Sequence, residues 1–480
     1  MRVLYVLLQL TWGLPQSLLG LLYLLREGKG KEHFWFHGAY VTRWDHTGGI
    51  SLGMFIFIGD PLMDYGEENA YLTHEYGHTI QSLLYGPLYL FIVGVPSSLW
   101  AAKYTKEKLR AGISYFSVFP EDQANRFGER VTGVKVPDQL PLEMFELDDS
   151  FALEIGGVRQ WVSIRGRDRT APVLLVLHGG PGSTLTGLSH LYQRPWERHY
   201  IVVNWDQRCS GKTATISGAK SEQEITLERM LADALELTDY LRRRFHREKI
   251  VLLGHSWGTM MGAHLVQAHP ERYAAYISTG TMVNTREESK LQASYYREKF
   301  GAEGNAKKRK RVEDLGAFWE DEIIPEDKTL AMNRILIEEG NSSVRAHGLI
   351  SDIRYELLPL LRSPEYTLKD ALNLFGYKAY TQIIEKDMPS FDLAKLGSEY
   401  RIPVYYIEGR QDMQTPYALA KAFYEKTVAP DNDFFTLDPC AHCWDVDAPE
   451  QMARVMCEEL PPRIRAYSSS SASSLRTRSR

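Results

Sequence analysis

The stretch that decides the fold is Ile250-Val251-Leu252-Leu253-Gly254-His255-Ser256-Trp257-Gly258. Its first four residues predict a strand buried on both faces, and residues Thr259–Ala268 follow with a helical pattern. Between strand and helix stands Gly-x-Ser-x-Gly, which places a serine in a tight turn. Small residues are needed two positions before and after Ser256, because side chains there would collide with neighbouring backbone. The turn would lift the serine hydroxyl to the carboxyl end of the sheet, beside the N-terminal amides of the helix.

Short apolar runs on both sides of this stretch predict further strands of the same sheet. Amphipathic segments such as Thr226–Arg244 lie between them. Strands that alternate with helices are typical of a mainly parallel sheet with helices on both faces. The first two runs form an antiparallel hairpin, with Gly156-Gly157 as its turn. The predicted strands are Phe151–Ile155, Val158–Ile164, Val173–Leu177, Tyr200–Asn204, Ala274–Ser278, Val404–Ile407 and Phe434–Leu437.

The composition divides the chain into four regions. Residues 285–395 are charged and helical in pattern, and they separate two core strands, as an inserted lid would. The run of four serines that begins at Ser468 cannot build a core, so we expect disorder there. The expected regions are an N-terminal region at 1–147, an α/β core at 148–284 and 396–462, a helical lid at 285–395 and a disordered Ser/Arg tail at 463–480.

A serine hydroxyl is a weak nucleophile at its ordinary pKa, so chemistry at Ser256 needs a base and a group that orients the base. In the α/β-hydrolase fold the chain order is serine, acid, histidine. Asp412 follows the strand Val404–Ile407, and His442 follows the next strand and is the last histidine of the chain. We therefore predict the triad Ser256, Asp412 and His442, with Asp438 and Asp445 as alternative acids near the histidine.

The oxyanion hole of such a site needs two backbone amides. One is the amide of Trp257, which follows the nucleophile. The other is expected from the loop His178-Gly179-Gly180-Pro181-Gly182, where Gly180 is the candidate. The glycines of this loop let the backbone approach a tetrahedral oxygen, and the proline fixes the turn.

Several motifs in their order along the chain resemble the proline iminopeptidase family of α/β-hydrolases. They are His178–Gly182, Asp206-Gln207-Arg208 with Ser210-Gly211, Gly254–Gly258, Gly409-Arg410-x-Asp412 and Ala441-His442. The resemblance covers about Leu147 to Pro462. It implies a serine aminopeptidase that removes an N-terminal residue, typically proline, from small peptides through an acyl-enzyme on Ser256. It also implies Asp412 as the acid, His442 as the base and the amides of Gly180 and Trp257 as the oxyanion hole.

Two positions depart from the family pattern, which usually has glycine at Cys209 and often at His255. The family also holds the free amine of the substrate with acidic lid residues. The lid offers several such residues, and the sequence does not single one out: Glu287, Glu288, Glu320 and Glu322. An esterase or lipase with the same serine chemistry is therefore the alternative, with a small ester as substrate in place of a peptide. No cofactor is expected for the hydrolase core.

The N-terminal region contains two apolar stretches of membrane-spanning length, Val3–Leu25 and Leu83–Ala102. We therefore expect a mainly helical, membrane-associated region, with a buried core helix as the alternative. Basic residues follow both stretches, so the sequence does not give a membrane orientation. The chain has only four cysteines, which favours a reducing compartment and hence a cytoplasmic hydrolase domain.

His74-Glu75-Tyr76-Gly77-His78 matches the pattern H-E-x-x-H. On a helix its two histidines share one face and can bind Zn²⁺, with Glu75 as a general base. Glu121 is the best third ligand, because Glu121-Asp122-Gln123-Ala124-Asn125 resembles the downstream motif of zinc metallopeptidases. A structural metal, or a histidine pair buried among helices, remains an alternative, and three nearby histidines could compete as ligands: His33, His37 and His46. The same region could be a membrane zinc peptidase in its own right.

The charge and the cysteines set further limits. The net charge is −5 and basic residues are spread along the 480-residue chain, so nucleic acid is not expected as a partner. Cys440 and Cys443 have C-x-x-C spacing, but no second such pair exists in the sequence. We interpret this spacing as coincidence rather than as a redox or metal site.

Overall fold

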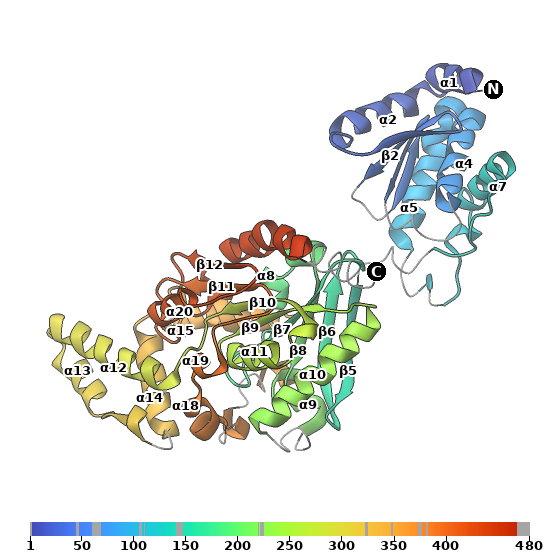
Figure 1. Ribbon diagram of the computed structural model, residues 1–480. Coiled ribbons are helices and arrows are strands. Elements are labelled where there is room, and N and C mark those ends of the chain that lie inside the picture. Colours follow the sequence, from blue (N-terminus) through green and yellow to red (C-terminus); the bar gives the residue numbers. More distant parts are fainter. Residues whose placement is uncertain are drawn as a thin grey trace, which may run out of the picture. The chain divides into compact units, whose positions relative to one another are not determined.

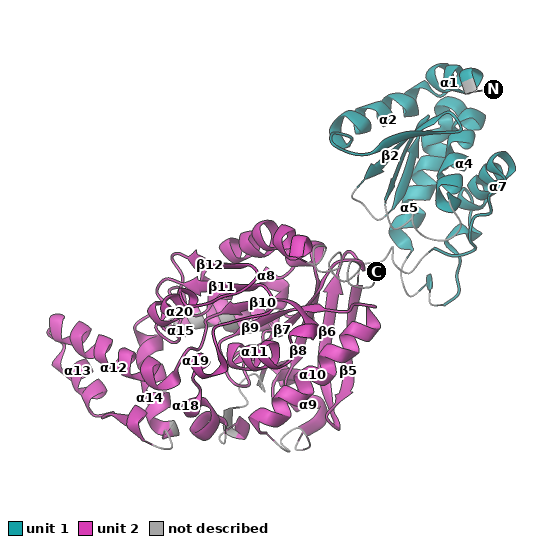
Figure 2. Ribbon diagram, in the orientation of Figure 1, with its two compact units in different colours: residues 1–146 teal, residues 147–480 magenta. Residues whose placement is uncertain are grey.

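The chain forms two compact units, residues 1–146 and 147–480 (Figure 2). The computed structural model describes residues 2–467 except 45–47, 60–68, 105–107, 110, 141–146, 219, 221–224, 322–324, 347–348, 373–376 and 381–382. Each unit has its own hydrophobic core, and each is described separately.

The second unit is built on an eight-stranded sheet with the order β12-β11-β10-β9-β7-β8-β6-β5 (Figure 1). The pairs β5–β6 and β6–β8 are antiparallel, and the other pairs are parallel. This confirms the predicted mainly parallel sheet and its N-terminal hairpin. The strands are β5 (Leu147–Ile155), β6 (Val158–Gly166), β7 (Val173–Leu177), β8 (Ile201–Asp206), β9 (Ile250–His255), β10 (Tyr273–Thr279), β11 (Val404–Gly409) and β12 (Asn432–Leu437).

Helices cover both faces of this sheet, and a separate apolar cluster fills each side. Leu237 and Met260 pack on one face, whereas Trp196, Trp444 and Met452 pack on the other. This layering is the α/β-hydrolase fold. The helices of the core are α8 (Ser189–Tyr192), η5 (Trp196–Arg198), α9 (Gly211–Ser217), α10 (Leu227–Arg244), α11 (Trp257–Ala268), η7 (Pro270–Arg272), α20 (Tyr417–Tyr424), α21 (Trp444–Asp447), α22 (Pro449–Arg454) and η12 (Val455–Glu459).

A helical insertion lies between β10 and β11, where the sequence predicts a lid (Figure 1). It has a small apolar cluster of its own, centred on Tyr296, Phe318 and Leu336. Its elements are α12 (Thr285–Ala302), α13 (Ala306–Glu313), η8 (Phe318–Glu320), α14 (Glu326–Glu338), α15 (Leu349–Asp352), η9 (Ile353–Leu357), α16 (Leu358–Leu361), α17 (Leu368–Leu372), η10 (Tyr377–Tyr380), η11 (Ile383–Asp387), α18 (Met388–Ser390) and α19 (Leu393–Leu396).

The start of the predicted tail is ordered, which corrects one boundary. Residues 460–467 are helical, and Ile464 is buried in the core. Arg463 donates to Asp433 at 2.6 Å and also pairs with Asp431. These contacts hold the first residues of the Ser/Arg segment against the domain. The disorder expected for residues 463–480 therefore does not apply to residues 463–467. The serine run from Ser468 lies outside the described residues.

The first unit contains a four-stranded sheet that the sequence prediction missed. Its strand order is β1-β2-β4-β3, with β2 and β4 parallel and the other pairs antiparallel. The predicted helices are present beside it, so the unit is α+β. Its elements are α1 (Arg2–Thr11), α2 (Leu14–Glu27), β1 (His33–Phe36), β2 (Ala39–Trp44), β3 (Gly49–Leu52), β4 (Phe55–Gly59), α4 (Ala70–Tyr85), η1 (Gly86–Leu88), η2 (Leu90–Gly94), α5 (Val95–Lys103), η3 (Tyr115–Ser117) and α7 (Glu121–Thr132).

Neither apolar stretch of the first unit folds as one straight span. The stretch Val3–Leu25 bends by 97° between α1 and α2, and the second stretch bends by 120° near Leu88. Gly13 lies at the first bend and Gly86-Pro87 at the second. In the described part of the chain, no single helix is long and apolar enough to cross a membrane, and only these two bent pairs meet the length and composition expected of a span.

Candidate active site

Ser256 lies in a strained turn between β9 and α11. Its φ of +54° belongs to the left-handed region that side chains disfavour. A Cβ on Gly254 would lie 2.5 Å from the carbonyl oxygen of Gly258, and a Cβ on Gly258 would lie 2.2 Å from that of Leu177. Glycine is therefore required at both positions, because any side chain there would collide with backbone. The sequence predicts this for the strand-to-helix turn that carries the serine, which we call the elbow.

His442 and Asp412 form a buried hydrogen-bonded pair. The Nδ1 atom of His442 lies 2.7 Å from Oδ2 of Asp412. The carboxylate also accepts the amides of Gln414 and Thr415 at 2.8 and 2.9 Å, which fixes its orientation. Burial lowers the pKa of His442, but the charge of Asp412 and this hydrogen bond outweigh it, so the pKa is raised overall. Asp412, rather than Asp438 or Asp445, is thus the acid that contacts the histidine.

The ring of His255, in the elbow, contacts the ring of His442. His255 precedes Ser256 in the chain, and its ring centroid lies 4.9 Å from that of His442. Its Nδ1 atom accepts a hydrogen bond from Nε1 of Trp444 at 3.2 Å and lies 2.9 Å from Oγ1 of Thr279. Burial and the neighbouring charge of His442 lower the pKa of His255 well below its usual value. A neutral ring therefore occupies the position where the family often has glycine.

The predicted oxyanion loop lies against the nucleophile. A Cβ on Gly179 would be 3.0 Å from Cβ of Ser256, so this loop passes beside the serine. Gly180 follows with a φ of +108°, which only glycine adopts readily. Among the described residues, the amides of Gly180 and Trp257 donate to no protein acceptor. Two amides without protein acceptors near a serine hydroxyl are what an oxyanion hole requires.

Cys209 replaces the usual glycine of the family at a position with left-handed backbone. Its φ is +57°, which explains why glycine suits this position. The side chain is buried next to Arg208, whose guanidinium Nε donates to Asp233 at 2.6 Å. The chain therefore has a buried thiol at a position where the family usually has glycine.

Of the lid carboxylates named from the sequence that the structure describes, only Glu288 is buried near the triad. Its Oε1 atom accepts the amides of Val283 and Asn284 at 2.6 and 3.2 Å. Burial raises its pKa to about 7, and the charges of Asp412 and His442 also act on it. Glu287 and Glu320 are exposed, and Glu322 lies outside the described residues.

Asp447 is a site residue that sequence reasoning missed. One of its oxygens accepts the amide of Ala441 at 2.9 Å, beside the histidine. The carboxylate also accepts the hydroxyl of Ser343 at 2.6 Å and the amides of Val344 and Arg345 at 2.9 and 3.1 Å. It thus ties the loop of His442 to the lid. The available sequence signal was an acidic residue shortly after the histidine, and its burial could not be read from the sequence.

Among the described residues, Cys440 and Cys443 form no disulfide, and the interpretation of their spacing as coincidence stays a prediction. The thiol of Cys440 is buried and donates to the carbonyl oxygen of Ala441 at 3.2 Å. Burial raises the pKa of this thiol, which disfavours the reactive thiolate.

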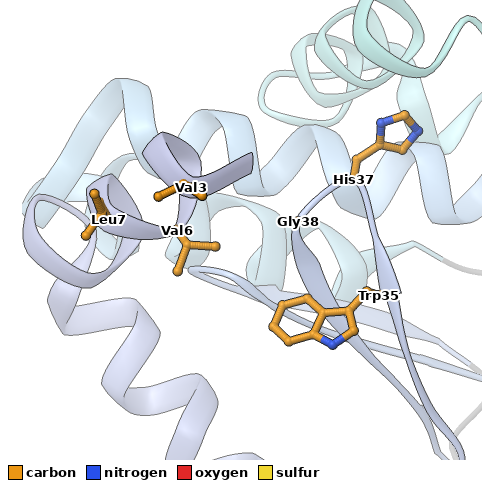
Figure 3. A pocket seen from close by; sticks show the side chains of 6 residues that line it. All are labelled: Val3, Val6, Leu7, Trp35, His37 and Gly38. Atoms are coloured by element: carbon orange, nitrogen blue, oxygen red, sulfur yellow. The ribbon is translucent and has the colours of Figure 1, made fainter. Parts of the chain in front are cut away.

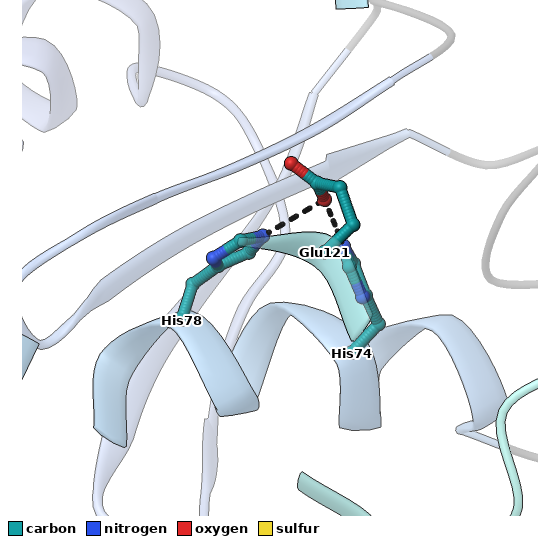
Figure 4. A group of neighbouring side chains, drawn as sticks. All are labelled: His74, His78 and Glu121. Carbon is teal, nitrogen blue, oxygen red and sulfur yellow. Dashed lines mark ion pairs between the residues drawn. The ribbon is translucent and has the colours of Figure 1, made fainter. Parts of the chain in front are cut away.

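In the first unit, the three predicted metal ligands come together (Figure 4). The Oε2 atom of Glu121, at the start of α7, lies 3.2 Å from Nε2 of His74 and 3.3 Å from Nε2 of His78 on α4. All three side chains are buried. Glu75 lies outside this group, and its Oε2 atom accepts the hydroxyl of Ser51 at 2.6 Å. His33 contacts Thr42 and the carbonyl of Gly28 instead, and His46 is outside the described residues.

Comparison with known proteins places matches in the second unit. Residues 168–317 match the family described as serine aminopeptidase, S33. The chain is 26% identical over 307 residues to the probable aminopeptidase YbaC of Bacillus subtilis (strain 168), a match that covers 63% of this chain and 93% of that protein. It is 25% identical over 293 residues to the proline iminopeptidase of Heyndrickxia coagulans, covering 59% and 88%.

Two further matches extend the comparison. A shorter segment of 145 residues is 31% identical to the lysophosphatidylserine lipase ABHD12 of Gallus gallus, covering 27% of this chain and 35% of that protein. Among solved structures, the proline iminopeptidase of Mycobacterium smegmatis is 17% identical with a TM-score of 0.48, covering 67% of this chain and 100% of that chain.

Proposed function

We propose that this chain, whose second unit is a proline iminopeptidase-like α/β-hydrolase, is a serine hydrolase that releases N-terminal residues from small peptides. The observation that carries the proposal is the buried pair of His442 and Asp412 beside the strained turn of Ser256. A base of raised pKa next to the strand-to-helix turn that carries a serine is suited to activate the serine hydroxyl.

In the proposed reaction, Oγ of Ser256 attacks the carbonyl carbon of the first peptide bond while His442 accepts the hydroxyl proton. The amides of Gly180 and Trp257 stabilise the oxyanion that forms. His442 then donates its proton to the leaving amine, and an acyl-enzyme on Ser256 remains. Water, deprotonated by His442, attacks this ester and releases the N-terminal residue as an acid. Asp412 stays ionised and orients the imidazole throughout.

We assign the recognition of the substrate amine to Glu288. It is the described lid carboxylate that is both buried and within electrostatic reach of the pair formed by His442 and Asp412. Its raised pKa, about 7, means that a bound ammonium group would favour the charged carboxylate. Peptides with a free amine would thus gain an interaction that amine-blocked peptides and esters lack.

The experiment compares Glu288→Gln with its exposed neighbour Glu287→Gln on three substrates: prolyl arylamide, its N-acetylated form and a short acyl ester. Loss of one charge-assisted interaction predicts about a 10- to 100-fold lower kcat/KM for the free-amine substrate alone. The Glu287 variant is expected to behave like the wild type. An equal loss on all three substrates would show that Glu288 supports the fold rather than the amine.

The second candidate function is hydrolysis of lipid esters at a membrane surface. Two observations favour it. The helices α1 and α2 bury polar side chains and expose apolar ones, and a shorter segment of the chain is similar to a lysophosphatidylserine lipase. Gln9 and Gln16 are buried and donate to Thr79 and Ser82 at 2.8 Å, whereas Leu18 and Leu22 are 50% and 64% exposed. A helix in water shows the opposite arrangement.

We propose from this polarity that the first unit associates with a lipid surface through α1 and α2. A cavity of about 350 Å³ lies between α1 and the turn after β1 (Figure 3). The lining is mostly apolar. It is formed by Val3, Val6, Leu7, Trp35, His37 and Gly38. Such a lining suits hydrocarbon better than a peptide backbone.

Lysophospholipid and prolyl arylamide, offered to the same full-length preparation, separate the two functions. The peptidase proposal predicts a higher kcat/KM for the arylamide, and Ser256→Ala should remove both activities. A preference for the lysophospholipid would select the lipase.

A further inference from the structure

The buried group of His74, His78 and Glu121 has no role in the serine chemistry of the second unit. It brings together three atoms that can each donate an electron pair, all within 4.8 Å of one another. Within the described part of the chain, neither oxygen of Glu121 has a hydrogen-bond partner, although the side chain is 0% exposed. A buried carboxylate without donors is costly unless a cation or charged group compensates it.

The outer hydrogen bonds of the two histidines set the direction of their lone pairs. Nδ1 of His78 lies 2.7 Å from Oε1 of Gln81. The orientation of this amide is fixed, because its Nε2 atom donates to the carbonyl of Pro120 at 2.8 Å. Nδ1 of His74 lies 2.6 Å from Oδ1 of Asn125. Both imidazoles therefore use Nδ1–H as a donor and turn the lone pair of Nε2 toward the carboxylate.

Metal-binding histidines in proteins show the same arrangement, with one nitrogen on the metal and the other donating to an oxygen. Ligands at the usual Zn²⁺ distances of about 2.0–2.1 Å in a tetrahedron are about 3.3–3.4 Å apart. The separations of 3.2 and 3.3 Å between Oε2 of Glu121 and the two Nε2 atoms agree with this spacing. Three ligands from two histidines and one carboxylate suit Zn²⁺ and leave its fourth position to water.

Two glycines allow the helices to approach closely enough for this contact. A Cβ on Gly77 of α4 would lie 1.9 Å from the carbonyl oxygen of Ala124. A Cβ on Gly128 of α7 would lie 2.0 Å from that of Thr73. Gly77 is a poor helix former inside the H-E-x-x-H pattern, and this contact explains its presence. The two helices are thus built to bring Glu121 over the histidine pair.

From this geometry we infer that His74, His78 and Glu121 bind one Zn²⁺ ion, independently of the serine hydrolase site. Glu75 is not a ligand, because its carboxylate is turned to the hydroxyl of Ser51. The ion links α4 to α7. The competing arrangement, in which both histidines are protonated around Glu121, contains no metal.

The test measures zinc by elemental mass spectrometry in the purified full-length protein. The inference predicts one zinc per chain in the wild type and in Ser256→Ala, and a loss of zinc in Glu121→Gln. Asp122→Asn is the matched control, because Asp122 is the next residue of α7 but faces Arg126 at the surface. Zinc lost equally from Glu121→Gln and Asp122→Asn would overturn the assignment of the ligands.

A second measurement covers the case in which Glu121→Gln fails to fold. Wild-type protein is stripped with a chelator, its fold is checked by circular dichroism, and Co²⁺ is added. The inference predicts the visible absorption bands of tetrahedral Co²⁺, with binding about 10- to 100-fold weaker in Gln81→Ala, which removes the partner of His78. Folded wild-type protein that contains no zinc and gives no cobalt spectrum would show that the histidines are a protonated pair.

Discussion

The Nδ1 atom of His442 lies 2.7 Å from Oδ2 of Asp412, and both side chains are nearly inaccessible to solvent. Two loops that follow neighbouring strands, β12 and β11, bring these groups together. The pair combines a buried base with a fixed counter-charge. Burial alone would lower the pKa of the imidazole, so its net rise depends on Asp412.

The pH dependence of kcat/KM should therefore report His442. The base acts when neutral, so activity should fall as the pH drops through its pKa. Because that pKa is raised, the midpoint of the acid limb is expected above the ordinary imidazole value of about 6.5. Asp412→Asn should reduce kcat by about 10⁴-fold and move the midpoint below that value. A pH–rate profile of both proteins checks this, and an unshifted acid limb in the variant would speak against the pairing.

Asp447 should control activity without touching the substrate. Asp447→Ala removes the acceptor for Ala441, Ser343 and Val344, and buried amides without partners cost about 1–3 kcal/mol each. We expect a lower thermal midpoint and a reduced kcat with the same acid limb of the pH profile. Asp438→Asn, in the same loop but half-exposed, is the control. A wild-type kcat in Asp447→Ala would contradict the coupling of lid and histidine loop.

Gly258 should be intolerant of even one methyl group. Gly258→Ala would press a Cβ against the carbonyl of Leu177, and such overpacking costs about 1–3 kcal/mol. The turn that carries Ser256 would shift, so activity should fall more than stability. Gly301→Ala in α12, where only the end of Arg309 lies within 4 Å, should be neutral or slightly stabilising. Denaturant unfolding and kcat/KM measure both effects, and similar results for the two variants would refute the steric argument.

The sequence predicted the second unit well because its signals are local. The elbow, the buried strand Val173–Leu177 and the helix after Thr226 each follow from a run of neighbouring residues, and the structure has β7 with the predicted bounds. The order of motifs also led to the resemblance to the proline iminopeptidase family, and the comparisons find similarity to a serine aminopeptidase family model and to a proline iminopeptidase. Asp412 and His442 could be placed at the sheet edge for the same reason.

Other features depend on contacts between distant residues, which no single stretch reveals. The bonds of Asp447 to the lid span about a hundred residues of sequence. The sheet of the first unit was missed because its short strands lie next to long apolar stretches that favour helices. The aromatic run His33–Phe36 and the glycines before β4 were the available signals. Whether a carboxylate such as Glu121 faces inward likewise depends on the packing of α7 on α4.

Lipid binding should depend on the outward leucines of α1 and α2. Replacing Leu7, Leu18 and Leu22 by Gln should reduce co-sedimentation of the full-length protein with phosphatidylcholine vesicles, because each buried side chain contributes about 1.5–3 kcal/mol. The matched control replaces Leu330 and Ile337, which are exposed in the lid. Unchanged binding in the triple variant, or equal loss in the control, would exclude this surface as the contact.

The central claim is that His442 activates Ser256 as a nucleophile. The most direct test treats the full-length protein with a fluorophosphonate and locates the adduct by peptide mass spectrometry. A single adduct on Ser256 is expected, formed quickly in the wild type and at least about 10³-fold more slowly in His442→Ala. An adduct on another residue, no adduct in folded protein, or equal rates in both proteins would contradict it.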